Sequence, residues 1–193
     1  MAHGEPLDAE RRAQLDHGTV TQRAEALAWL AVHGDQSATH AVVERLRDED
    51  PSVRGLAEQT LWAIWTRSGD PEVDRLMEQG VQLTNEQNYE EALSVFGEII
   101  RRRPDFAEGY NKRATVLYLM GDYLHSLEDV EQTLRRNPEH FGALSGGGLC
   151  MLKLERLAEA LSYFERALAV NPNMEGIRIL ADQLRRAKPK PLI

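Results

Sequence analysis

The side chains that could carry chemistry are scattered along this chain rather than gathered in a motif. The six histidines form no HExxH pair and no spacing typical of a zinc site. No Gly-x-Ser-x-Gly turn is present, and no nucleophile has a base that the sequence places beside it. Paired carboxylates such as Glu90–Glu91 fall in expected turns or on solvated helix faces. We therefore expect no enzyme activity, no metal site and no cofactor.

Three consecutive glycines, Gly146–Gly148, are the most unusual short stretch. A phosphate-binding glycine loop precedes a helix and presents free N–H groups. Here the flanking apolar pattern predicts that the glycines lie inside a helix, and no Lys-Ser/Thr pair follows. Each glycine in a helix interior costs about 0.5–1 kcal/mol relative to alanine. Three explanations stay open: a neighbouring side chain fills the space, the helix kinks, or the backbone is left open for a partner.

The single cysteine, Cys150, excludes an internal disulfide and a cysteine-based metal cluster. In an apolar helix it is typical of a small core residue. The first residues contain no apolar segment of a signal peptide. These features fit a cytoplasmic protein, and a periplasmic protein whose leader has been removed stays open.

Composition favours helices packed on helices. Hydrophobic residues make up 42% of the 193 residues and aromatic residues only 6%, whereas strands need β-branched and aromatic side chains. No apolar run is long enough to span a membrane. The net charge is −8, and the charge along the chain changes from acidic in the N-terminal part to basic at the C-terminal end. A mainly acidic chain argues against nucleic-acid binding. The same gradient would permit a homo-oligomer formed by charge-complementary ends.

A regular period organises the second half of the chain. Pro104, Pro138 and Pro172 are evenly spaced and lie near the ends of three segments of equal length, 73–106, 107–140 and 141–174. Each segment has the apolar spacing of two amphipathic helices, and proline ends the second because it cannot continue the hydrogen-bond ladder. A fixed period of this length indicates a repeat architecture.

The three segments resemble the tetratricopeptide repeat, a helix–turn–helix unit of the same length. The matches at repeat positions 8, 20 and 24 are, in order along the chain, Gly80, Ala114 and Gly148; Ala92, Ser126 and Ala160; and Phe96, Val130 and Phe164. Position 7, usually leucine, departs from the pattern with Gln79, Arg113 and Gly147. The resemblance implies an all-α fold, a right-handed α-α superhelical solenoid.

In this family the first helix of each repeat lines a concave groove, which implies a site for a protein or peptide ligand. The groove positions that we expect to contact a partner are Met77, Val81, Asn111, Thr115, Tyr118, Ser145, Leu149 and Leu152. Such a neutral-to-apolar lining suits an extended peptide or a partner helix. Co-chaperones of the family grip acidic chain ends with lysine and asparagine at two of these positions. Here those positions hold Met77 and Val81, so the clamp is expected to be absent.

The remaining segments are expected to flank this array. Residues 16–70 contain three helical patterns, at 20–33, 37–47 and 51–66, and resemble a short HEAT-like segment. Residues 175–187 have the pattern of a capping helix, which a repeat array needs at its end. We expect residues 1–15 to be disordered and 188–193 to form a flexible tail.

Together these features predict a non-catalytic scaffold or adaptor that binds its partner in the groove of the repeats. Two alternatives stay open: a self-assembling structural solenoid, and an accessory subunit of an enzyme or assembly complex.

Overall fold

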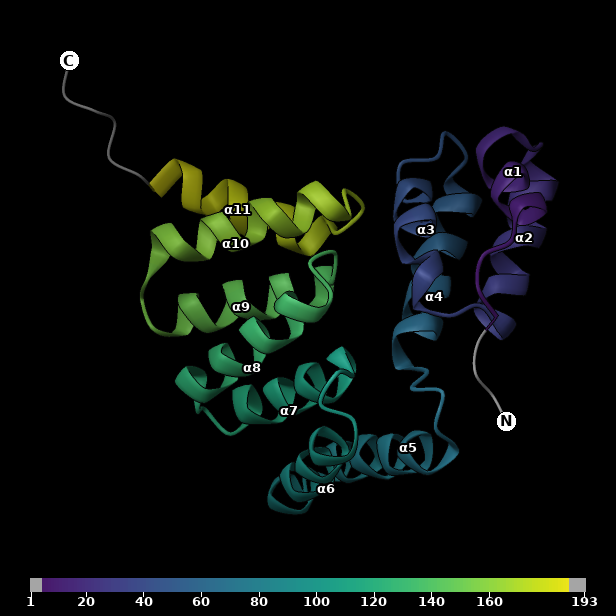
Figure 1. Cartoon of the computed structure of the whole chain (residues 1–193). Helices are drawn as coiled ribbons and strands as arrows, with labels where there is room; N and C mark the ends of the chain where they lie inside the picture. The colour runs from purple at the N-terminus through teal and green to yellow at the C-terminus, as the bar shows by residue number, and fades with distance from the viewer. Residues whose placement is uncertain (1–4, 188–193) are drawn as a thin grey trace. The chain divides into compact units, whose positions relative to one another are not determined.

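The computed structural model describes residues 5–187 and divides them into two compact units, one ending at Gly109 and the other beginning at Tyr110. Apart from one isolated bridge between Glu5 and Gly34, every regular element of the described residues is helical (Figure 1). The all-α prediction is therefore confirmed. The elements are α1 (Ala9–His17), α2 (Val20–His33), a 3-10 turn (Gln36–Ala38), α3 (Thr39–Arg45), α4 (Pro51–Thr66), α5 (Pro71–Asn85), α6 (Tyr89–Arg102), α7 (Ala107–Leu119), α8 (Tyr123–Arg136), α9 (Phe141–Lys153), α10 (Leu157–Val170) and α11 (Glu175–Ala187).

Local sequence signals start two of the helices in the same way. Asp50 and Asp70 each precede a proline, and each carboxylate accepts a hydrogen bond from a backbone N–H two residues later, at 2.8 and 2.9 Å. Proline suits the first helical position because the N–H that it lacks would have no partner within the helix. α2 and α4 cover the ranges predicted for them, whereas 37–47 divides into a 3-10 turn and the shorter α3. The HEAT-like character of residues 16–70 stays a prediction.

The first unit extends well past residue 70, where the sequence predicts a boundary. It includes α5 and α6, which pack against each other. The Arg103 guanidinium, just after α6, donates to the backbone carbonyl of Ser68 at 2.8 Å. The Ser68 N–H in turn donates to the Asp74 carboxylate at 2.8 Å. These bonds connect the segment between α4 and α5 to the first turn of α5 and to the residue that follows α6.

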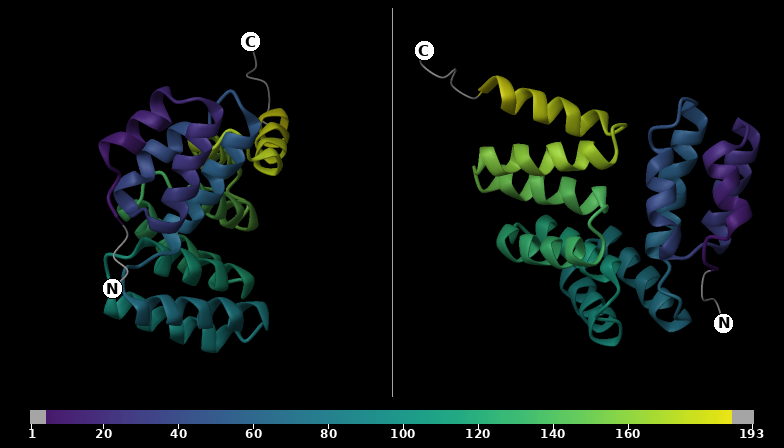
Figure 2. Two further views of the ribbon diagram at one scale, coloured as in Figure 1. Left: turned by 90° about the vertical axis from the view of Figure 1, so that its right-hand side faces the viewer. Right: turned by 45° about the horizontal axis from the view of Figure 1, so that its top comes forward.

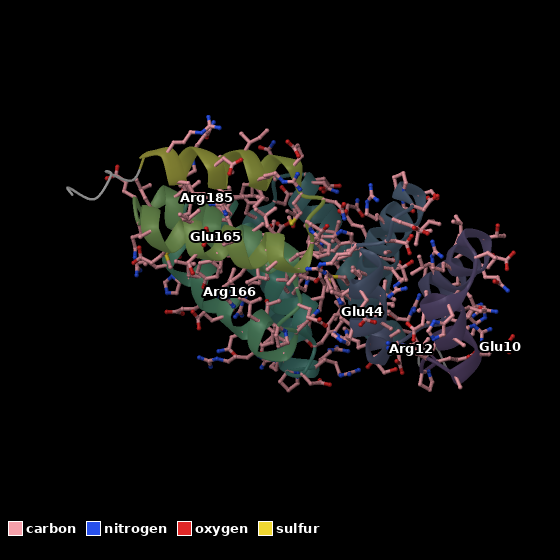
Figure 3. All side chains as sticks on the ribbon, turned by 90° about the horizontal axis from the view of Figure 1, so that it is seen from above. Glu10, Arg12, Glu44, Glu165, Arg166 and Arg185 are labelled. Atoms are coloured by element: carbon pink, nitrogen blue, oxygen red, sulfur yellow. The ribbon has the colours of Figure 1, made fainter. Side chains whose placement is uncertain are left out.

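The prediction that residues 1–15 are disordered is wrong for the part that the structure describes; residues 1–4 lie outside it. α1 begins at Ala9 with Asp8 as its N-cap, and Leu15 is completely buried. Arg12 bonds Glu44 of α3 at 3.1 Å, a pair labelled in Figure 3. Only one strongly apolar side chain of this polar helix enters the core, so the helical period gave a weak signal.

Leu15→Ala should lower the free energy of unfolding by about 2–4 kcal/mol, because it removes a completely buried side chain and leaves a cavity. Urea denaturation followed by circular dichroism measures the change. Val20→Ala, at a side chain that is 38% exposed, is the control and should cost much less. A loss below about 0.5 kcal/mol at Leu15 would contradict the packing of α1 into this unit.

The turn between the two helices of each repeat has the same backbone geometry three times. Gln87, Gly121 and Glu155 occupy the same position of successive repeats, and all have positive φ angles, of 64°, 84° and 59°. The following residue donates its N–H to a carbonyl five residues earlier, at 2.9 Å in every case. This is the Schellman arrangement that ends helices with a left-handed residue. Only the second repeat places glycine there, although the conformation suits glycine best.

The second unit is a layered set of antiparallel helices. α9 packs against α8 and α10, and α10 packs against α11. Figure 1 and the right-hand view of Figure 2 show α9, α10 and α11 side by side. α11 covers the residues predicted for the capping helix, and it holds α10 through an ion pair between Arg185 and Glu165 at 3.0 Å (Figure 3). The predicted tail, 188–193, lies outside the described residues.

Candidate functional site

An apolar hollow of the second unit lies among α7, α8 and α9. Its volume is about 200 Å³. The residues that line it are Asn111, Ala114, Thr115 and Tyr118 of α7, Ser126 and Val130 of α8, and Gly142, Ala143, Ser145, Gly146 and Leu149 of α9. None of these side chains is charged.

Five of the eight residues predicted to contact a partner meet around this cavity: Asn111, Thr115, Tyr118, Ser145 and Leu149. They come from the first helices of two successive repeats, so a full repeat of sequence separates them. A sixth, Leu152, does not line the cavity; it is half-buried and packs against the adjoining hydrophobic core.

The other two predicted residues, Met77 and Val81, belong to α5 in the first unit. Met77 is only 5% exposed, so it offers a partner little surface, and Val81 is half-buried. Neither belongs to the cavity.

The serine and threonine hydroxyl groups around the cavity donate their protons within the protein. Thr115 donates to the Asn111 carbonyl at 3.0 Å, Ser145 to the Gly142 carbonyl at 2.9 Å, and Ser126 to the Ala114 carbonyl at 2.8 Å. The cavity is therefore lined mainly by carbon atoms and by hydroxyl oxygens that can accept hydrogen bonds. Tyr118 forms one side, with its ring centroid 5.5 Å from that of Tyr123.

The glycine run has two explanations rather than one. A Cβ added at Gly147 would lie 2.7 Å from the Tyr163 ring, and one at Gly148 would overlap the Phe164 ring. Both glycines therefore let α10 aromatics lie directly on the backbone of α9, which continues as one helix. A Cβ at Gly146 would meet nothing within 4 Å. Gly146 is the glycine whose backbone stays open, and it lines the cavity.

At the cavity, the second repeat replaces the glycine–phenylalanine contact of the other two repeats with alanine and valine. In the first and third repeats, Phe96 and Phe164 lie against Gly80 and Gly148. The second repeat instead has Val130 at the position of the phenylalanines, together with Ala114. Val130 is not among the residues predicted from the sequence to line the groove, although its alignment with two phenylalanines was a usable signal.

Gly146→Ala should raise the free energy of unfolding by about 0.5–1 kcal/mol, because alanine favours the helix and meets no obstacle. Gly148→Ala should lower it by about 1–3 kcal/mol, because the methyl group overlaps a buried ring. Thermal and urea denaturation of the two variants test this contrast. Equal effects at both positions would contradict the difference in packing.

Arg113 replaces the usual apolar residue of its repeat position and forms a bidentate ion pair with Asp129 of α8. The two N–O distances are 2.7 and 2.8 Å, and the Asp129 side chain is only 5% exposed. Hydrogen bonding to Asp129 raises the pKa of the Arg113 guanidinium. This pair connects α7 to α8 beside the cavity. It explains why the second repeat has arginine at position 7, where the family usually has leucine.

Arg113→Leu, which restores the residue type usual for the family, should destabilise the protein by about 1.5–3 kcal/mol because it leaves a buried carboxylate without its charged donor. The double variant Arg113→Leu/Asp129→Leu should recover much of that loss. A double-mutant cycle by urea denaturation measures the coupling. If the two single losses simply add, the ion pair contributes nothing.

The cysteine of the second unit has a structural role. Cys150 is buried, and its thiol lies 3.2 Å from the Ser126 hydroxyl. Burial raises the pKa of this thiol, which disfavours the reactive thiolate. Within residues 5–187 no group of three or more histidine, cysteine or acidic side chains is placed to hold a metal ion. No helix in that range has the length and apolar character to cross a membrane.

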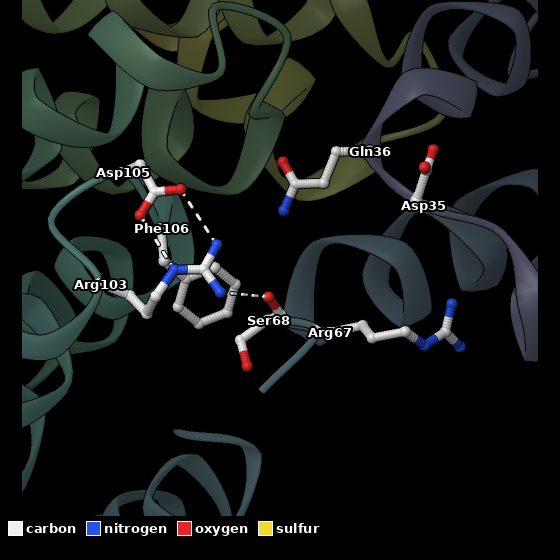
Figure 4. A pocket seen from close by; sticks show the side chains of 8 residues that line it. Asp35, Gln36, Arg67, Ser68, Arg103, Asp105 and Phe106 are labelled. Atoms are coloured by element: carbon white, nitrogen blue, oxygen red, sulfur yellow. Dashed lines mark hydrogen bonds and ion pairs between the residues drawn. The ribbon is translucent and has the colours of Figure 1, made fainter. Parts of the chain in front are cut away.

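A more polar hollow of about 300 Å³ lies within the first unit, between the ends of α4 and α6 (Figure 4). Its two arginines are already engaged. Arg103 pairs with Asp105 through two 3.0 Å bonds and also holds Ser68, and Arg67 donates to the carbonyls of Ala31 and Gly34 at the end of α2. Guanidinium groups beside helix C-termini stabilise those ends. We therefore regard this hollow as structural.

Comparison with known proteins places the repeats in a family. Residues 111–175 match the model of the tetratricopeptide repeat. A TPR repeat-containing protein of Rhizobium etli is 32% identical over 142 residues, which covers 72% of this chain and 70% of that protein. The chain belongs to the tetratricopeptide repeat family. The resemblance stated from the sequence is thereby confirmed.

Other tetratricopeptide relatives are longer. The Hsp70-Hsp90 organizing protein of Triticum aestivum is 25% identical over 150 residues, which cover 75% of this chain but 25% of the wheat protein. Tetratricopeptide repeat protein 4 of mouse is 30% identical over 122 residues, 60% of this chain and 32% of the mouse protein.

Solved structures of tetratricopeptide proteins share the fold. The first such domain of Spaghetti (RPAP3), bound to an HSP90 peptide, has a TM-score of 0.58 and 21% identity over 60% of this chain and 91% of that one. The Yersinia enterocolitica type III secretion chaperone SycD, in complex with a peptide of the translocator YopD, has a TM-score of 0.60 and 15% identity over 62% and 97%. At these identities the likeness establishes the fold alone.

Proposed function

We propose that this protein is a non-catalytic adaptor that binds a peptide or helix of a partner protein on the face formed by α7 and α9. The observation that carries the proposal is the meeting of five predicted groove residues around one uncharged cavity. The solved relatives bound to HSP90 and YopD peptides give independent support, since they are peptide-binding proteins of the same fold.

The polar groups at the cavity suit a peptide backbone. The Asn111 amide can both donate and accept hydrogen bonds, and the hydroxyl oxygens of Thr115 and Ser145 can accept. Apolar surface from Tyr118 and Leu149 supplies non-directional contact beside them. A mixture of apolar lining and few polar groups is characteristic of recognition sites.

Adaptor function is favoured over self-assembly by the state of the basic end. The α11 side chains Arg178 and Arg185 already pair with Glu175 and with Glu165 and Asp182 of the same chain. Surface pairs of this kind contribute little stability, but they partly neutralise the charge that a head-to-tail contact would need.

The function is tested by affinity capture from cells of the source organism, with wild-type protein beside Asn111→Ala/Tyr118→Ala. The double variant should lose the captured partner by at least about tenfold, because it removes the amide and one wall of the cavity. Circular dichroism and urea denaturation establish that it stays folded. Thr115→Arg, at an exposed position on the rim, provides a second variant that blocks the cavity without removing a buried group.

Leu124→Ala/Leu157→Ala is the matched control, because these side chains are 61% and 49% exposed and lie outside the cavity. It should retain the partner. Capture that survives both cavity variants would locate the binding site elsewhere and refute the proposal.

A further inference from the structure

We propose that the cavity receives one large, uncharged aliphatic side chain of the partner, of the size of leucine, and that Gly146 determines which side chains enter. This inference rests on the proposed function, because it specifies the chemistry of the segment that the α7–α9 face binds. The relevant surface consists of Ala114, Val130, Gly146 and Leu149, with Tyr118 at the side.

The size of the cavity indicates a side chain rather than a whole small molecule. Pockets for small molecules occupy about 300–1,000 Å³, whereas this cavity measures about 200 Å³. An anchor residue of a partner that fills such a pocket is the usual centre of a binding interface.

The charge of the occupant follows from the lining. No lining side chain is charged, and Arg113, on the same helix, is held by Asp129 in a bidentate pair. A carboxylate or ammonium group placed in the cavity would lose its hydration without gaining a counter-ion. The hydroxyl protons of Thr115, Ser145 and Ser126 are also directed at helix carbonyls, so these three hydroxyls do not donate to an anion in this arrangement. An aliphatic group has no polar hydration to lose on entry and gains from burial.

Of the three consecutive glycines, Gly146 is the one that packing within the protein does not explain. Gly147 and Gly148 make room for Tyr163 and Phe164, whereas a side chain at Gly146 would extend into open space beside the cavity. A glycine in a helix interior lowers helix stability. Gly146 lines the cavity with its backbone alone, and this gives the glycine a reason in recognition.

The test uses the ¹⁵N-labelled full chain, titrated with N-acetyl-L-leucinamide and with the nearly isosteric N-acetyl-L-aspartic acid α-amide, and followed by NMR. The leucine probe should shift the backbone amides of Gly146, Thr115 and Ser145 saturably. The aspartate probe should bind at least about tenfold more weakly, since it presents a carboxylate in place of the isopropyl group. Equal responses, or no saturable shift at these amides, would overturn the proposal.

Gly146→Leu should abolish the response to the leucine probe by filling the cavity from within. Gly97→Leu is the matched control: Gly97 also lies inside a helix with nothing within 4 Å of an added Cβ, but far from the cavity in sequence and in the other unit. It should leave the response unchanged. Gly146→Ala, which adds one methyl group and is expected to fold, should weaken binding by an intermediate factor. A response that persists in both Gly146 variants refutes the role of this glycine.

The outcome is separable from that of the proposed function. If the partner captured by wild-type protein is lost in Asn111→Ala/Tyr118→Ala but retained in Gly146→Leu, the face binds a partner and the anchor inference is wrong. If it is retained in all of them, the proposed function fails as well.

Discussion

The rest of the structure depends on one contact between the two helices of a repeat. In this contact a bulky side chain of the second helix lies against the backbone of the first. Phe164 lies directly on Gly148, and Phe96 on Gly80. A flat ring on a bare helix brings the two axes close together and buries a large apolar area. The distance between the two helix axes of a repeat then determines which residues of the first helix stay outside this contact.

The second repeat meets this constraint with alanine and valine in place of glycine and phenylalanine, and the cavity lies beside them. Val130 and Ala114 keep the two helices in contact but occupy less volume than an aromatic side chain. The bidentate pair of Arg113 and Asp129 stabilises the same two helices by a different means. An ion pair and an alanine–valine contact thus lie at the cavity, where the neighbouring repeats place a phenylalanine ring against a glycine.

The cavity also separates this protein from one mode of recognition known in its family. A clamp for an acidic chain end needs positive charge directed at the ligand. In this chain the two clamp positions hold Met77, which is buried, and Val81, and the cavity on α7 and α9 has an uncharged lining. Binding energy at such a surface comes chiefly from burial of apolar area, with backbone hydrogen bonds setting direction.

The sequence by itself determined the repeat, because a regular period is imposed by each unit's need to bury one face against the next. It therefore located α5 to α11 closely, and the residues 111, 115, 118, 145 and 149 could be placed on one face from their positions in the repeat. Only the tertiary structure decided which positions form a cavity, because that depends on volumes contributed by three helices at once, among them those of Val130, Ala114 and Gly146. It also decided that Met77 is buried and that α1, with one fully buried leucine, is ordered. Whether such a side chain is buried depends on residues that are distant in the sequence. The local sequence pattern carries no information about those residues.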